Sequence, residues 1–168
     1  MKTQVISEKL RTDKKMIKKY TVKTPQETEN IGKELARALE DSGIFRAFIA
    51  LRGEMGVGKT AFCRGFASHF GISGVKSPTY TVLNEYRGRV KLHHFDFYRI
   101  SDEDDLYSIG YDDIIEEDGY SLGEWSENIE GMLPSDTITV TISRLPYTDE
   151  ESTLMRNIEI NSCKDLNL

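Results

Sequence analysis

The stretch from residue 53 to residue 60, Gly-Glu-Met-Gly-Val-Gly-Lys-Thr, has the residue types and spacing of a phosphate-binding loop. Its glycines permit a tight turn whose backbone N–H groups face phosphate oxygens. Lys59 adds a cation for the terminal phosphates, and the Thr60 hydroxyl is suited to ligate Mg²⁺. The pattern predicts a nucleoside triphosphate site made of Gly53, Glu54, Met55, Gly56, Val57, Gly58, Lys59 and Thr60.

The flanking sequence gives this loop the context that it needs. Residues 45–52 are short and mostly apolar and end at the loop, which predicts a buried strand. Phe62, Phe66 and Phe70 recur every four residues before Gly71, which predicts a helix directly after the loop. A glycine-rich turn before an ordinary core helix is the simpler alternative, but a strand and a helix on the two sides favour phosphate binding.

Two acidic residues are candidates to complete a magnesium site. Asp96 ends a predicted strand that begins at Val90, and Glu124 ends one that begins at Tyr120. In open α/β sheets, ligands bind at the carboxyl ends of strands, so an acid there can face the phosphates. Neither strand is strongly apolar, and an ordinary exposed carboxylate is an equally good interpretation of either residue.

Hydroxyl residues follow the phosphate-loop helix, where P-loop switch proteins place a side chain that senses the γ-phosphate and Mg²⁺. Hydroxyls on one face of a strand are an equally good interpretation. The residues concerned are Ser77, Thr79 and Thr81.

Three further side chains have a structural interpretation. The adjacent His93 and His94 should point to opposite faces of a strand, which predicts one packed and one exposed imidazole and disfavours a joint metal site. Trp125 and Cys63 are predicted to lie in the core.

The order of the predicted elements is that of an α/β protein. A capping box at residues 24–27 begins a helix that ends near Gly43. Further strands are expected at residues 75–86, 89–97, 120–125, 137–142 and 155–160, with short helices around Leu106 and Ile114. This order predicts a three-layer P-loop NTPase fold with a mixed β-sheet. We expect a basic N-terminal arm at 1–19, a single P-loop ATPase domain at 20–160 and a polar tail at 161–168.

Composition narrows the function classes. The chain has 168 residues with a net charge of −6, yet residues 1–19 carry seven basic and two acidic side chains, so the rest is strongly acidic. An acidic body disfavours strong nucleic-acid binding, and a solvated arm is favoured over one that contacts RNA or an acidic partner. No apolar run reaches membrane-spanning length, there is no secretory signal, and the two cysteines lack metal-ligand spacing, so we expect a cytoplasmic protein without a membrane segment.

Four segments, in this order, resemble the TsaE family, whose older name is YjeE. They are the phosphate loop, Ser-Pro-Thr-Tyr-Thr at 77–81, His-His-Phe-Asp-Phe-Tyr-Arg at 93–99 and Gly-Glu-Trp-Ser-Glu at 123–127. The resemblance covers roughly residues 20–145. The family comprises bacterial P-loop ATPases that act in making threonylcarbamoyladenosine on tRNA. The chain departs mildly from the family pattern at Tyr80, Phe97, Gly123 and Ser126.

The resemblance implies a role for each candidate residue. Residues 53–60 would hold the ATP phosphates, and the region from Thr24 to Thr28 would lie near the adenine. Thr60 and Glu124 would hold Mg²⁺, with Asp96 near the metal or the attacking water. The catalytic residues would be Lys59, Asp96 and Glu124. Trp125 would follow the metal-binding acid, and residues 77–81 would form a switch-like loop.

The resemblance also implies a function. The chain would be an ATP-binding and ATP-hydrolysing switch subunit that acts with TsaD-like and TsaB-like proteins and meets tRNA only through that complex. Its activity alone would be weak. A P-loop small-molecule kinase is the alternative, although residues 100–130 are acidic where such kinases usually carry an arginine-rich lid. A GTPase-like switch is a further alternative, although the chain lacks the Asn-Lys-x-Asp guanine motif at residues 161–165.

Overall fold

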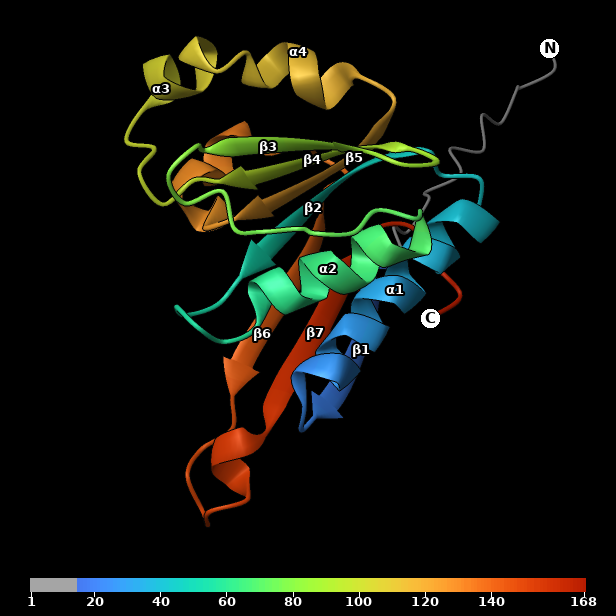
Figure 1. Cartoon of the computed structure of the whole chain (residues 1–168), viewed down its shortest axis with the longest axis vertical. Coiled ribbons are helices and arrows are strands. Elements are labelled where there is room, and N and C mark those ends of the chain that lie inside the picture. Colours follow the sequence, from blue (N-terminus) through green and yellow to red (C-terminus); the bar gives the residue numbers. More distant parts are fainter. Residues whose placement is uncertain (1–14) are drawn as a thin grey trace, which may run out of the picture.

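The computed structural model describes residues 15–168, and its strands form one mixed sheet (Figure 1). The strand order is β1-β7-β6-β2-β5-β4-β3. Strands β6, β2, β5 and β4 run parallel, whereas β7, β1 and β3 pair antiparallel with their neighbours. The bounds are β1 Met16–Val22, β2 Arg46–Arg52, β3 Leu83–Arg87, β4 Lys91–Asp96, β5 Gly119–Glu124, β6 Ile138–Arg144 and β7 Arg156–Ser162.

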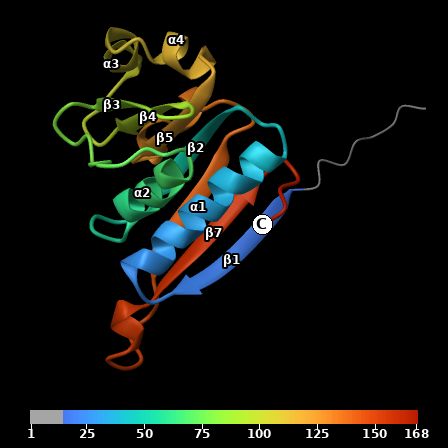
Figure 2. The same cartoon turned by 45° about the vertical axis from the view of Figure 1, so that its right-hand side comes forward.

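Helices cover this sheet from both sides, which confirms the predicted α/β class with a mixed sheet. On one side, α1 (Pro25–Asp41) lies along β7 and β1, with α2 (Lys59–His69) beside it (Figures 1 and 2). On the other side lie α3 (Glu103–Ser108), α4 (Tyr111–Glu116) and the 3-10 segment η1 (Ser126–Met132). A second 3-10 turn, η2 (Ser152–Leu154), lies in the connection between β6 and β7.

Two apolar cores follow from this arrangement, because successive side chains of β2 point to opposite faces of the sheet. Ile49 packs with Leu39 and Phe66 under α1 and α2. Phe48 packs on the other face with an aromatic group, and its ring lies 6.4 Å from that of Phe95 and 6.1 Å from that of Tyr111. The central strands are therefore buried on both faces.

Glycine lets the two long helices approach closely. A Cβ atom on Gly65 of α2 would lie 1.8 Å from the backbone oxygen of Glu29 in α1, and one on Gly32 would lie 2.3 Å from the oxygen of Phe62. These contacts are shorter than any side chain permits, so the backbones touch. The contact fixes the start of α1 beside the start of α2, where the phosphate loop ends.

The structure corrects two predicted boundaries. Residues 16–19, which the sequence assigned to the basic arm, form the first half of β1 and pair with β7. At the other end, β7 continues to Ser162, and Leu166 is buried, so the polar tail is partly packed. Alternation in β1 is weak because this edge strand is largely exposed and carries two adjacent lysines, Lys18 and Lys19. Residues 1–14, the remainder of the predicted arm, lie outside the described residues.

A third correction concerns residues 75–86, which were predicted to be extended throughout. Only the strand β3 forms there, because residues 79–81 make a turn that is closed by the N–H of Val82 donating to the oxygen of Pro78 at 2.8 Å. The segment before β3 is therefore a loop. Its Thr and Tyr residues favour strands but are overruled by this turn.

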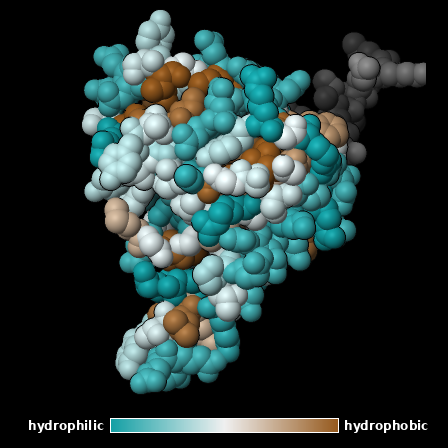
Figure 3. Space-filling model, viewed as in Figure 1, coloured by the Kyte–Doolittle hydropathy of each residue, from teal (hydrophilic) through white to brown (hydrophobic). Residues whose placement is uncertain are grey.

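The surface seen in Figure 3 is mostly hydrophilic, and its largest hydrophobic group lies near α3 and α4. Among the described residues, no helix combines the length and the apolar character that crossing a membrane requires.

Candidate functional site

The phosphate loop joins the carboxyl end of β2 to the start of α2. Gly53 and Gly58 adopt φ angles of 141° and 122°, a region that side chains disfavour, and a Cβ on Gly53 would lie 2.3 Å from the oxygen of Ile142. No side chain caps the first turn of α2. The N–H groups of this turn are therefore available to an anion, as the motif requires.

Lys59 is buried at the base of the loop, with a residue exposure of 4%. Its Nζ donates hydrogen bonds to the backbone oxygens of Gly53 and Glu54, at 2.7 and 2.9 Å. It also lies 4.6 Å from the centroid of the Trp125 ring. The half-buried Trp125 thus packs against the second core on one side and faces the ammonium on the other, so the core interpretation describes only part of its surroundings.

Asp96 and Glu124 lie opposite each other at the carboxyl ends of β4 and β5. Each is 4% exposed, so neither is an ordinary surface carboxylate. Glu124 Oε1 accepts a hydrogen bond from Thr60 Oγ1 at 3.0 Å and lies 2.9 Å from His94 Nε2. The sheet therefore brings one of the two acids into direct contact with the phosphate-loop threonine.

Asp96 is bound to the loop that precedes β3. Its Oδ2 accepts a hydrogen bond from Thr79 Oγ1 at 3.1 Å, and its Oδ1 accepts one from the N–H of Tyr98 at 2.9 Å. Ser77 Oγ lies 2.9 Å from Thr79 Oγ1, whereas Thr81 Oγ1 donates to Asn84. Of the three predicted switch-like hydroxyls, one contacts the acid, one reaches it through its neighbour, and Thr81 points elsewhere.

Both adjacent histidines are buried, so the prediction of one exposed imidazole is wrong. The reason is that β4 is covered on both faces. Burial lowers the pKa of His93. His94 Nε2 also lies 3.5 Å from Cys63 Sγ, and burial, with the nearby Glu124 charge, raises the pKa of that thiol well above its usual range. Cys63 is a buried thiol, as predicted.

A cavity of about 320 Å³ opens beside the loop, a volume that suits a small-molecule ligand. Thr28 forms part of its wall, together with the glycines of the loop, Thr60 and Glu124. Five lining residues escaped the sequence analysis: Lys23, Ala61, Arg64, Leu154 and Arg156. Arg64 follows Thr60 by four residues, so the two side chains lie on the same face of α2, and this spacing could have indicated Arg64. No local pattern points to Lys23, Leu154 and Arg156, which the tertiary structure brings in from the β1–α1 connection, the β6–β7 connection and the start of β7.

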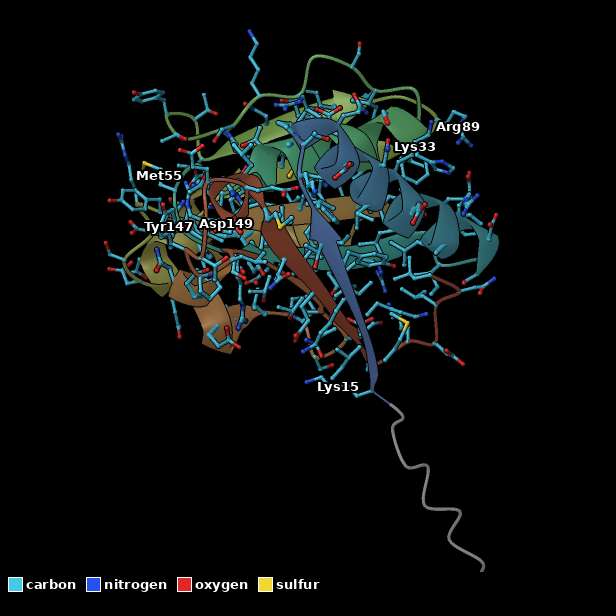
Figure 4. The ribbon with its side chains drawn as sticks, turned by 90° about the horizontal axis from the view of Figure 1, so that it is seen from below. Lys15, Lys33, Met55, Arg89, Tyr147 and Asp149 are labelled. Atoms are coloured by element: carbon cyan, nitrogen blue, oxygen red, sulfur yellow. The ribbon has the colours of Figure 1, made fainter. Side chains whose placement is uncertain are left out.

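The connection between β6 and β7 borders this end of the molecule. Figure 4 shows Met55 of the phosphate loop at the same end as Tyr147 and Asp149 of that connection. Arg144 Nε donates to Glu54 Oε1 at 2.6 Å, which joins the end of β6 to the loop. The cavity is thus formed by segments from distant parts of the sequence.

The donor atoms of the site suit Mg²⁺, which prefers oxygen ligands. The carboxylates of Asp96 and Glu124 and the Thr60 hydroxyl supply such oxygens. Within residues 15–168, neither carboxylate forms an ion pair with a lysine or arginine. Two buried acids without a lysine or arginine partner, one of them in contact with the His94 imidazole, favour a bound cation.

Comparison with known proteins agrees with this architecture. The family model described as "Threonylcarbamoyl adenosine biosynthesis protein TsaE" matches residues 22–153. The chain is 36% identical to the tRNA threonylcarbamoyladenosine biosynthesis protein TsaE of Bacillus subtilis, over 80% of this chain and 83% of that protein. It is 39% identical to the Haemophilus influenzae protein of the same name, over 77% of this chain and 79% of that protein.

A solved structure shows the same fold. The crystal structure of YdiB from Bacillus subtilis superposes with a TM-score of 0.70 at 28% sequence identity, over 89% of this chain and 88% of that chain. The phosphate loop, the fold match and the family match over residues 22–153 all point to the same family. The chain therefore belongs to the TsaE family of P-loop, ATP-binding proteins.

Proposed function

We propose that this chain is an ATP-binding and ATP-hydrolysing switch subunit that acts in the biosynthesis of threonylcarbamoyladenosine on tRNA. Its partners would be TsaD-like and TsaB-like proteins in the cytoplasm, and tRNA would be reached through their complex. The observation that carries the proposal is the contact between Thr60 Oγ1 and the buried Glu124 carboxylate, 3.0 Å apart at the mouth of the cavity. Membership of the family supports the pathway and the partners.

The phosphate loop would bind the triphosphate of ATP. Lys59 Nζ is already at the base of the loop, where it donates to two backbone oxygens. An arriving phosphate would replace these oxygens as the acceptor, so that the ammonium and the N–H groups at the start of α2 stabilise the charge that develops on the γ-phosphate. The adenine would lie toward Thr28, in the part of the cavity that α1 lines.

Thr60, Glu124 and Asp96 would hold Mg²⁺. The ion, when bound, neutralises charge on the phosphates. His94 and Thr60 both contact Glu124 Oε1, so this carboxylate has little freedom to rotate. Asp96 is joined through Thr79 to the loop before β3, and that contact gives the loop a way to respond when the γ-phosphate is lost. This is the feature that favours a switch.

The test is phosphate release from Mg²⁺-ATP by the purified chain, alone and with TsaD-like and TsaB-like partners. Slow release without any acceptor, which changes when the partners and tRNA are added, would support the proposal. Release that depends on an added metabolite would favour the kinase, and a preference for GTP would favour a GTPase.

A pair of variants ties the activity to the site. Glu124→Ala should abolish most Mg²⁺-dependent turnover and weaken metal-free nucleotide binding much less. Glu127→Ala, three residues away and exposed, is the matched control and should behave as the unmodified chain. Equal loss of binding and turnover in Glu124→Ala would point to misfolding instead of the loss of a metal ligand.

A further inference from the structure

A thiol, an imidazole and a carboxylate meet behind the Mg²⁺-type site. Cys63 comes from α2, His94 from β4 and Glu124 from β5. Their sulfur, nitrogen and oxygen atoms all lie within 4.8 Å of one another. Cys63 and His94 are 0% exposed and Glu124 is 4% exposed, so the group is held rigidly by the surrounding core.

Two of the three separations among these atoms are close to those of a zinc coordination shell, and the third, between Cys63 Sγ and Glu124, is within 4.8 Å. His94 Nε2 lies 2.9 Å from Glu124 Oε1 and 3.5 Å from Cys63 Sγ. A tetrahedral Zn²⁺ with bonds of about 2.0–2.3 Å separates its ligand atoms by about 3.3–3.6 Å. We propose that Cys63, His94 and Glu124 form a binding site for a soft divalent cation of the Zn²⁺ class. Adjustments of a few tenths of an ångström suffice for the two measured separations.

The chemistry of the three ligands distinguishes this site from the Mg²⁺ site. Thiolate and imidazole select Zn²⁺ and related ions, whereas Mg²⁺ takes oxygen ligands only. A thiolate and a carboxylate together balance the charge of a divalent cation. When the ion binds, the S–H proton of Cys63 is released to solvent and a metal–sulfur bond forms.

To ligate an ion, His94 Nε2 exchanges its 2.9 Å contact with Glu124 Oε1 for a metal bond. Its Nδ1 is buried and has no hydrogen-bond partner among the described residues. With an ion bound, the ring proton resides on Nδ1 and the lone pair of Nε2 faces the ion. An open fourth position would lie toward Thr60, whose hydroxyl is 3.0 Å from Glu124 Oε1.

The nucleotide cavity gives an ion access to these residues. Glu124 and Thr60 line the cavity, and Cys63 and His94 lie directly behind Glu124. A soft ion in the site would bind the same carboxylate oxygen that contacts Thr60. It would therefore oppose Mg²⁺-dependent hydrolysis, a consequence that rests on the proposed function.

The direct test uses Co²⁺, which reports a thiolate ligand through a sulfur-to-cobalt charge-transfer band in the ultraviolet. The full chain has two cysteines, so Cys163→Ser, at an exposed position, is a matched control for Cys63→Ser. We expect the band in the unmodified chain and in Cys163→Ser, its loss in Cys63→Ser, and its disappearance when Zn²⁺ displaces Co²⁺. Absence of the band, or its loss in Cys163→Ser alone, would overturn the proposal.

Two further measurements guard against a variant that fails to fold. X-ray absorption of Zn²⁺-loaded Cys163→Ser should show one sulfur neighbour at about 2.3 Å. A shell of nitrogen and oxygen only would refute the site. His94→Gln should weaken Co²⁺ binding at least about tenfold, since even outer partners of metal ligands contribute that much. Unchanged affinity would remove His94 from the site.

The kinetic consequence is tested separately. Zn²⁺ should inhibit phosphate release by the unmodified chain and by Cys163→Ser, and should inhibit Cys63→Ser at least about tenfold less strongly. Equal inhibition of both variants would refute the competition with Mg²⁺. The Co²⁺ spectra need neither ATP nor turnover, so a failure of the proposed ATPase activity would leave their outcome readable.

Discussion

The centre of the sheet, formed by β2, β5 and β4, and its wing, defined as β1, β7 and β6, differ in how they meet solvent. In β4 and β5, five of six residues are buried, because apolar layers cover both faces. In the wing, buried and more accessible residues alternate along β6 and β7, because α1 covers only one face. Thr141 of β6 and Asn157 of β7 lie on the other face of this strand pair.

This difference explains where the chemistry is found. A polar side chain in the centre is cut off from water and needs a specific partner, so His94, Asp96 and Glu124 each have one. A polar side chain on the outer face of the wing can meet water instead. Burial on both faces thus makes the ends of the central strands suitable for charged groups with fixed positions.

The largest contrast should appear in stability. Phe95→Ala removes a fully buried ring that stacks on Phe97 at 5.3 Å, and we expect a loss of about 3–5 kcal/mol in the free energy of unfolding. Thr141→Ala, on the outer face of the wing, should change it by less than about 0.5 kcal/mol. Urea denaturation measures both. Similar losses would show that the two regions are not packed differently.

The next largest difference between the two regions should appear in nucleotide affinity. Lys59→Ala should weaken ATP binding by about 1.5–3 kcal/mol, since hydrogen bonds to a charged group contribute that much. Lys19→Ala, an exposed lysine of the wing that pairs with Glu159, should leave the Kd unchanged. Titration calorimetry gives both values, and an unaltered Kd for Lys59→Ala would count against the assignment of the loop.

A smaller effect on stability is expected from the β1–α1 connection, which joins the wing to the site. Thr24 Oγ1 accepts from the N–H of Glu27 at 3.2 Å, which is one half of the predicted capping box. In the other half, Glu27 Oε2 accepts at 2.6 Å from the N–H of Lys23, the residue before the N-cap, and not from that of Thr24. Thr24→Ala should lower stability by about 1 kcal/mol, while Thr24→Ser should retain most of it. Thermal melting compares the two variants. Equal melting temperatures would show that the cap contributes nothing.

The smallest effect concerns pH. Burial lowers the pKa of His93, so the unfolded chain binds more protons than the folded one below about pH 6.5. The stabilising contribution is complete above that pH and is lost as the pH falls toward the lowered pKa. His93→Gln should therefore flatten the decline of the unfolding free energy as the pH falls below about 6.5. An unchanged slope would show that His93 is not the group that titrates.

The sequence by itself determined the features that depend on chain neighbours. The phosphate loop, the helix after it and the helix start at residues 24–27 are each a single short segment. Each is specified by turns and hydrogen bonds within a few residues. The α/β class also followed, because the spacing of apolar residues marks helices and strands one by one. The same local reading missed β1, whose exposed lysines carry no strand pattern.

The tertiary structure decided what depends on strand order and register. The pairing of β4 with β5 places Asp96 opposite Glu124, and the pairing of β2 with β5 brings Glu124 beside Thr60, 64 residues away. Burial of both histidines and the approach of Arg156 to the cavity depend on the same long-range contacts. Such contacts result from the packing of whole layers, which no short segment encodes. The sequence therefore named the catalytic candidates, and only the fold showed which of them meet.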